Sequence, residues 1–206
     1  MNHDHSPLSK SSFLQRVKYL SSFILLLWLI ELADRLLFQG SLENHGIHPR
    51  SFSNLHGFLF APLLHAGWGH LLGNSLSLLV LGSIILAPAS GWRNLAQVSV
   101  ASMTLAGLLV WLIGASGSNH IGASSLVFGF LSFLLASGFY QRTPLTIIIS
   151  ILVGIFYSGA IFGILPSDSG ISWESHLGGA IGGILIARNK RLHKITGPRD
   201  GDLLSS

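Results

Sequence analysis

Six apolar runs, each about as long as a membrane-spanning helix, constrain the fold of this chain more than any other feature. A hydrocarbon core about 30 Å thick needs roughly 20 helical residues to cross it. Only 10% of the residues are charged, whereas about a quarter is usual in soluble domains. The sequence therefore predicts an all-α fold, a polytopic membrane bundle of six transmembrane helices. The expected spans are 19–39, 69–87, 94–114, 122–140, 144–165 and 173–189.

The expected organisation is one membrane domain with a short tail at each end. Residues 1–18 form the predicted N-terminal tail, 19–190 the six-span domain and 191–206 the C-terminal tail. Twelve residues are Lys or Arg, and ten of them fall in these tails, in the loops after the second and fourth spans, or at the end of the sixth span, where Arg188 and Lys190 lie. Cytoplasmic loops carry an excess of basic residues. Both termini are therefore expected in the cytoplasm, and the second, fourth and sixth spans begin at the outer face.

The first span carries two charged residues, which are costly at membrane depth. Glu31 and Arg35 are four residues apart with the acid first, so they can pair on one helix face. We expect this pair to face the bundle or the outer interface in a structural role, and catalysis by Glu31 is the alternative.

The longest stretch between spans, residues 40–68, holds many apolar side chains among Gly and Pro. It is predicted to lie in the outer interface with its apolar side in lipid. A distorted beginning of the second span is the alternative interpretation.

Three polar motifs stand at the beginnings of the three spans that start at the outer face. His70 and Asn74 lie in HLLGN, Gly122 and Ser124 in GASS, and His176 in HLGG. The topology therefore places these motifs at similar depth, although they are far apart in sequence. Ser124 is a weak nucleophile unless a base takes its proton, and His176 is the natural base.

The remaining motif residues fit the same chemistry. Attack on a carbonyl creates an oxyanion that needs preorganised donors, and the side chains of His70 and Asn74 and the Ser124 backbone N–H are the candidates. Gly179 and Gly183 form a stripe below the histidine that lets helices approach closely. Asp168 and Glu174 are expected in the outer loop, away from the imidazole. The sequence thus predicts a Ser–His dyad without an acidic third member.

At these motifs the chain resembles the rhomboid family of intramembrane serine proteases. The resemblance covers about residues 50–190 and rests on HAGWGHLLGN, GASS and HLGGAIGGI in this order. It implies a bacterial six-span core with Ser124 and His176 as the dyad and His70 and Asn74 as oxyanion donors. It also implies cleavage of transmembrane protein substrates near the outer face of the plasma membrane, without a cofactor or a metal. Supporting residues would be Gly122, Phe128, Gly179 and Gly183.

Three departures from the family pattern involve four positions. His56 and Gly57 stand where many members have Trp-Arg, and Ser125 stands where Gly commonly follows the nucleophile. Phe128 stands where Tyr is frequent, and its ring can still stack on His176.

Several alternatives remain open from the sequence. Ser125 is a rival nucleophile, and His65 is expected to be structural, bonding loop backbone. His45, His48, His56 and His120 are expected to be solvated or interfacial.

A non-catalytic membrane-helix binding protein is the alternative function, and a small-solute transporter is a third. The expected partners are membrane protein substrates and the lipid bilayer, not nucleic acid, and the oligomeric state is left open.

Overall fold

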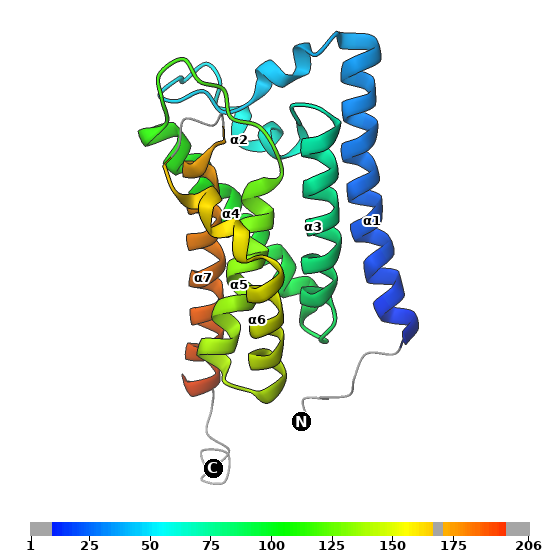
Figure 1. The fold of residues 1–206 in the computed structure, drawn as a ribbon, viewed down its shortest axis with the longest axis vertical. Helices are drawn as coiled ribbons and strands as arrows, with labels where there is room; N and C mark the ends of the chain where they lie inside the picture. The colour runs from blue at the N-terminus through cyan, green and yellow to red at the C-terminus, as the bar shows by residue number, and fades with distance from the viewer. Residues whose placement is uncertain (1–9, 167–170, 197–206) are drawn as a thin grey trace, which may run out of the picture.

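Long helices that run up and down side by side make up most of the molecule (Figure 1). The structure, a computed structural model, describes residues 10–166 and 171–196. Within these ranges there is no strand beyond one isolated bridge, so the predicted all-α fold is confirmed. The elements are α1 (Lys10–Ala33), η1 (Asp34–Phe38), η2 (Ser41–His45), α2 (Gly57–Phe60), η3 (Ala61–Leu63), α3 (Trp68–Leu86), α4 (Gly91–Ile113), α5 (Ser124–Gln141), α6 (Pro144–Phe156), η4 (Ser158–Ile164) and α7 (Trp173–Thr196).

Each predicted span corresponds to a helix or to a bent pair of helices. Among the described residues, α3, α4 and α5 are long and apolar enough to cross a membrane, and α6 with η4 makes a fourth if the pair is one span. The six-span count therefore stays a prediction. The helices α3, α5 and α7 all begin at the end of the bundle where η1, η2 and α2 lie (Figure 1).

The first helix extends further than the sequence suggests. It begins at Lys10, inside the predicted tail, and its first turns are anchored by Arg16. The guanidinium donates to the carbonyl oxygens of Leu86 (3.2 Å) and Pro88 (2.8 Å), where α3 ends. The last helix likewise continues to Thr196. The rest of the predicted tails, residues 1–9 and 197–206, lies outside the described residues.

The predicted span 144–165 is broken. Thr143 begins α6 with a capping box and Pro144 follows at the first helical position, where its missing N–H costs nothing. The helix ends at Phe156, and η4 continues at an angle of 67°. Ser158, Gly159 and Gly163 in this stretch are weak helix formers, which favours the break.

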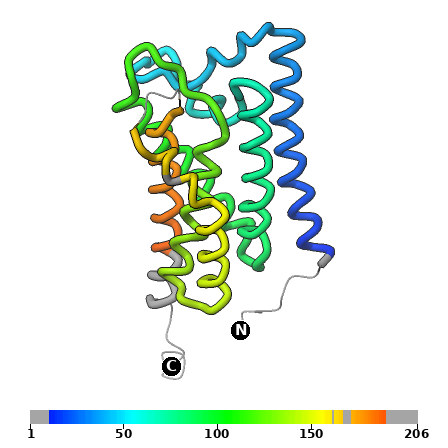
Figure 2. The backbone as a smooth tube through the Cα atoms, in the orientation of Figure 1, coloured from blue at the N-terminus to red at the C-terminus, as the bar shows by residue number. Residues whose placement is uncertain are grey.

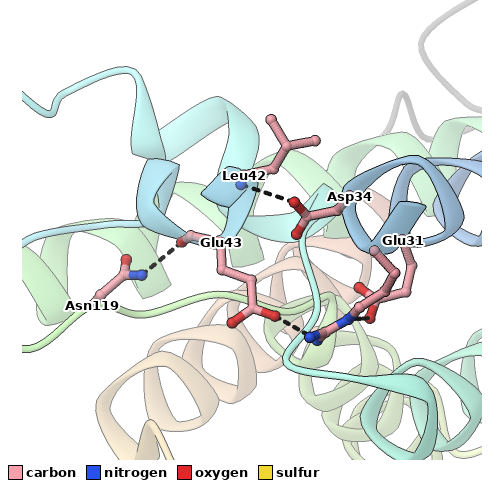
Figure 3. Close-up of polar contacts among 6 residues, drawn as sticks. Glu31, Asp34, Leu42, Glu43 and Asn119 are labelled. Carbon is pink, nitrogen blue, oxygen red and sulfur yellow. Dashed lines mark hydrogen bonds and ion pairs between the residues drawn. The ribbon is translucent and has the colours of Figure 1, made fainter. Parts of the chain in front are cut away.

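Charged side chains connect the C-terminal end of α1 to η2 (Figure 3). The Arg35 guanidinium donates to Glu31 at 2.9 Å and to Glu43 of η2 at 2.5 Å. Asp34 accepts a hydrogen bond from the backbone of η2, and Asn119 donates to the Glu43 carbonyl oxygen. Glu31 is 2% exposed, whereas the Arg35 side chain is 38% exposed. The expected ion pair is therefore present with its acidic partner facing the bundle, and its structural role stays a prediction.

The segment between η2 and α3 crosses the end of the bundle as turns and short helices, separate from α3. Its outer side exposes apolar residues, with Phe52 at 77% and Leu59 at 70% exposure. Its inner side is buried at Ala61 and His65. The apolar outer side fits the predicted interfacial loop, and the alternative of a distorted first turn of α3 is not what the structure has.

Glycines bring α7 against both α5 and α4, which lie beside it (Figure 2). A Cβ on Gly179 would collide with the Ser125 carbonyl oxygen, and one on Gly183 with a carbonyl oxygen one turn further along α5. Gly178 and Gly182 meet the backbone of α4 in the same way. The predicted stripe therefore faces α5, the helix that carries Ser124.

This contact gives a first prediction. Gly179→Ala should lower the unfolding free energy by roughly 1–3 kcal/mol, because the new methyl group must push α7 away from the α5 backbone. Gly73→Ala on α3 is the matched control, since its Cβ would meet nothing within 4 Å. The control should be neutral or stabilising by up to about 1 kcal/mol. Thermal unfolding in detergent measures both, and equal midpoints for the two variants would contradict the close-packing account.

Candidate active site

Ser124, the first serine of the GASS motif, is the first residue of α5 and is buried at the end of the bundle. The chain enters this helix through Gly122, whose φ of +117° is a conformation that L side chains rarely adopt. The Gly122 N–H donates to the Ala61 carbonyl oxygen at 2.8 Å, and the Ala123 N–H donates to Nε2 of His65 at 3.4 Å. The expectation that His65 bonds loop backbone is therefore confirmed.

His176 lies in the first turn of α7 with both ring nitrogens hydrogen-bonded. Nε2 is 2.8 Å from the Ser124 hydroxyl oxygen, and Nδ1 is 2.8 Å from the Gly163 carbonyl oxygen. A carbonyl oxygen can only accept, so Nδ1 of the neutral ring carries the proton. Nε2 is then an acceptor for the Ser124 hydroxyl, which is the state a general base needs.

The ring of Phe128 stacks on the imidazole of His176, with centroids 4.1 Å apart and an interplanar angle of 13°. Phe128 lies one turn after Ser124 on α5, so the same helix supplies the hydroxyl and the stacking surface. The imidazole is thus held by one ring face and by hydrogen bonds at both nitrogens.

His70 and Asn74 of α3 lie beside the turn that leads into Ser124. A Cβ on Gly122 would come within 2.6 Å of the His70 ring and 3.6 Å of Nδ2 of Asn74. Nδ2 of Asn74 is buried and has no hydrogen-bond partner in the structure. A buried donor without an acceptor is costly, so this amide is poised to receive an acceptor beside Ser124.

The neighbouring serine occupies a different place. Ser125 is buried, and it lines a small cavity together with His120, Ser175 and Gly122. The hydrogen bond of His176 goes to Ser124. The geometry therefore favours Ser124 over Ser125 as the partner of the base.

Two features of the site carry no clear sequence signal or were misread. The Gly163 carbonyl that binds His176 is a backbone group on η4, and no residue type marks it. Glu174 lies buried in the first turn of α7, which begins at Trp173, and not in the outer loop as expected. Asp168 lies outside the described residues. His120 is partly buried, which is compatible with the expected interfacial position, and both of its ring nitrogens are hydrogen-bonded.

Comparison with known proteins agrees with the motif pattern. Residues 53–190 match the Rhomboid domain. The chain belongs to the rhomboid family. This family consists generally of serine proteases that act on membrane proteins within the bilayer, so the chain is an integral membrane protein.

The similar proteins come from mycobacteria. Uncharacterized proteins of Mycobacterium tuberculosis and Mycobacterium bovis are each 40% identical over 196 residues, covering 87% of this chain and 80% of theirs. An uncharacterized protein of Mycobacterium leprae is 40% identical over 174 residues, covering 81% of this chain and 68% of its own. The descriptions of these relatives name no activity.

The buried histidine of the loop before α3 gives a prediction on pH. Burial, reinforced by the neighbouring His70, lowers the pKa of His65 from 6.5 to about 4. Below pH 6.5 the His65 ring binds a proton in the unfolded chain but stays neutral in the folded chain. The contribution of neutral His65 to the unfolding free energy is therefore present at neutral pH and is lost as the pH falls toward 4.

His65→Gln keeps an acceptor for the Ala123 N–H but cannot be protonated. Between pH 7 and pH 5 the wild type should lose roughly 2 kcal/mol more unfolding free energy than this variant. Denaturant titrations in detergent at the two pH values measure the difference. Identical pH dependence in both proteins would show that His65 does not stay neutral in the fold.

Proposed function

We propose that this chain is an intramembrane serine endopeptidase in which Ser124 is the nucleophile and His176 the general base. The hydrogen-bond chain from the Ser124 hydroxyl through His176 to the Gly163 carbonyl supports this proposal, because only one neutral tautomer satisfies it. That tautomer leaves Nε2 free to take the serine proton. Both side chains are buried.

The reaction follows from these positions. Nε2 of His176 takes the hydroxyl proton while Oγ of Ser124 attacks the carbonyl carbon of a substrate peptide bond. The imidazolium then gives the proton to the leaving amine, and an acyl ester remains on Ser124. A water molecule, deprotonated by the same base, hydrolyses the ester and regenerates the enzyme.

The negative charge that develops on the substrate oxygen needs donors in place beforehand. The unpartnered Nδ2 of Asn74, the ring of His70 and the backbone N–H of Ser124 at the start of α5 are the proposed donors. Gly122 supports them, because any side chain there would displace the His70 ring. Gly179 and Gly183 support the dyad by allowing α7 to lie against α5.

The proposed substrates are membrane proteins with a span that can unwind near the outer face. A peptide carbonyl within a helix is hydrogen-bonded and shielded, so it must be released before Ser124 can reach it. Gly and polar residues lower the cost of opening such a helix. The proposed orientation has both termini in the cytoplasm and the site toward the outer face, in the bacterial plasma membrane.

The decisive experiment labels the detergent-solubilised protein with a fluorophosphonate probe and follows cleavage of a single-span model substrate. Ser124→Ala should abolish both labelling and cleavage, because the probe reacts with an activated serine. Ser125→Ala is the matched control, since it removes the adjacent hydroxyl and leaves the bond to His176. It should retain labelling and cleavage.

The same experiment decides between the proposal and the alternatives. If Ser125→Ala loses labelling while Ser124→Ala retains it, the nucleophile is Ser125 and the proposed assignment is wrong. A folded wild type that binds the substrate helix but neither labels nor cleaves would support a non-catalytic membrane-helix binding protein.

The oxyanion donors are tested separately. Asn74→Ala should lower kcat by about 10²–10³-fold with little change in KM, because the amide acts on charge that appears only in the transition state. Asn94→Ala is the control, since Asn94 on α4 also has a buried amide atom without a partner and lies in the first turn of α4, far from the dyad. Steady-state cleavage in detergent measures both. A rise in KM at unchanged kcat would instead assign Asn74 to substrate binding.

A further inference from the structure

His120, in the loop between α4 and α5, contacts Ser172, the residue before α7, and the proposed reaction does not use this contact. Its Nδ1 is 2.6 Å from the Ser172 hydroxyl oxygen, and its Nε2 is 2.6 Å from the Ser118 hydroxyl oxygen. Its backbone is paired with Ile47 in both directions, at 2.9 and 3.1 Å. The ring is therefore fixed relative to the end of the bundle.

The protons in this cluster can be assigned. The Ser118 hydroxyl lies 2.6 Å from the Ala115 carbonyl oxygen, which can only accept, so this hydroxyl donates there. Ser118 then accepts from Nε2 of His120, and the neutral ring has a free lone pair on Nδ1. The Ser172 hydroxyl donates to that lone pair. One tautomer thus satisfies every hydrogen bond of the ring.

The position of the contact is informative. His120 precedes Ser124 by four residues, and Ser172 precedes His176 by four. Both pairs are 52 residues apart in sequence. The Ser172 carbonyl oxygen also accepts from the His176 N–H at 3.1 Å, so Ser172 is part of the backbone that begins α7.

We propose that His120 is a positioning residue, which through Ser172 holds the first turn of α7 at the distance from α5 that the Ser124–His176 hydrogen bond requires. The glycine contacts fix α7 below the dyad, whereas this bond fixes it above. The imidazole of His176 is then held between two points and cannot tilt away from Ser124. This inference rests on the proposed function for its effect on catalysis, but its structural part does not.

The contact requires a neutral ring at Nδ1, and the surroundings favour one. Burial lowers the pKa of His120, with His48 acting in the same direction and Glu174 of α7 opposing it. The neutral form therefore prevails at neutral pH. Protonation in acid would replace the acceptor at Nδ1 with a donor and reverse the bond to Ser172.

Three variants test the proposal: His120→Ala, Ser172→Ala and the double variant. Each single change should lower kcat for substrate cleavage by roughly three- to tenfold, the effect of one lost neutral hydrogen bond, with KM unchanged. The double variant should be no worse than either single one, because both remove the same bond. His120→Asn should restore most of kcat, since its side-chain oxygen can accept from Ser172. His48→Ala is the control and should match the wild type.

Hydrogen exchange of the amides of residues 173–177 provides a readout that does not depend on activity. His120→Ala and Ser172→Ala should exchange there faster by a similar factor, and His120→Asn should exchange close to wild type.

If His120→Ala and Ser172→Ala keep wild-type kcat and exchange, the positioning role is wrong while the protease stands. If the wild type neither labels nor cleaves, the proposed function fails, and the exchange data still decide whether His120 holds α7. If His120→Ala does not fold, Ser172→Ala and His120→Asn decide alone.

Discussion

The backbone of α7 lies directly against the backbone of α5, and the candidate site depends on this contact. Gly179 and Gly183 leave no side chain between the two helices. Lipid offers little hydrophobic drive for helix association, so close packing and hydrogen bonds between helices must provide it. The hydroxyls of Ser102 and Ser132 donate to carbonyl oxygens of α7 at 3.1 and 2.8 Å, which adds such bonds at the same level. Because the contact starts one turn after His176, it brings the imidazole within reach of α5.

A backbone carbonyl does for His176 what a carboxylate does in a serine protease triad. An unpaired carboxylate in an apolar bundle would be costly to desolvate, whereas the Gly163 carbonyl fixes the same tautomer without a charge. The stacked ring of Phe128 restricts the imidazole further. The Gly163 carbonyl reaches the ring only because the chain turns by 67° after α6 and returns over α7 as η4. The break within the predicted fifth span thus has a direct consequence for the proposed base.

The sequence predicts the parts of this structure that depend on side-chain pattern and spacing. Apolar runs locate the helices, and the i, i+4 spacing of Glu31 and Arg35 gives their ion pair. The contacts that the sequence does not predict depend on how separate loops fold against one another. Glu43 joins the ion pair from η2, and His120 bonds Ser172 just before α7, because separate turns converge at one end of the bundle. The Gly163 carbonyl belongs to the same class, since a backbone group has no residue type to mark it.

The departures from the family pattern fall where backbone contacts fix the geometry. The segment leading into α5 is held by the backbone of residues 47 and 61 and by the ring of His65. Gly57, which stands where other members carry a basic side chain, has no room for one, because its Cβ would collide with the Gly46 carbonyl oxygen. The path of this loop is therefore set by its backbone contacts, which also support the start of α5. Catalysis by positioning requires a fixed nucleophile, and backbone hydrogen bonds provide that whichever side chains the loop exposes.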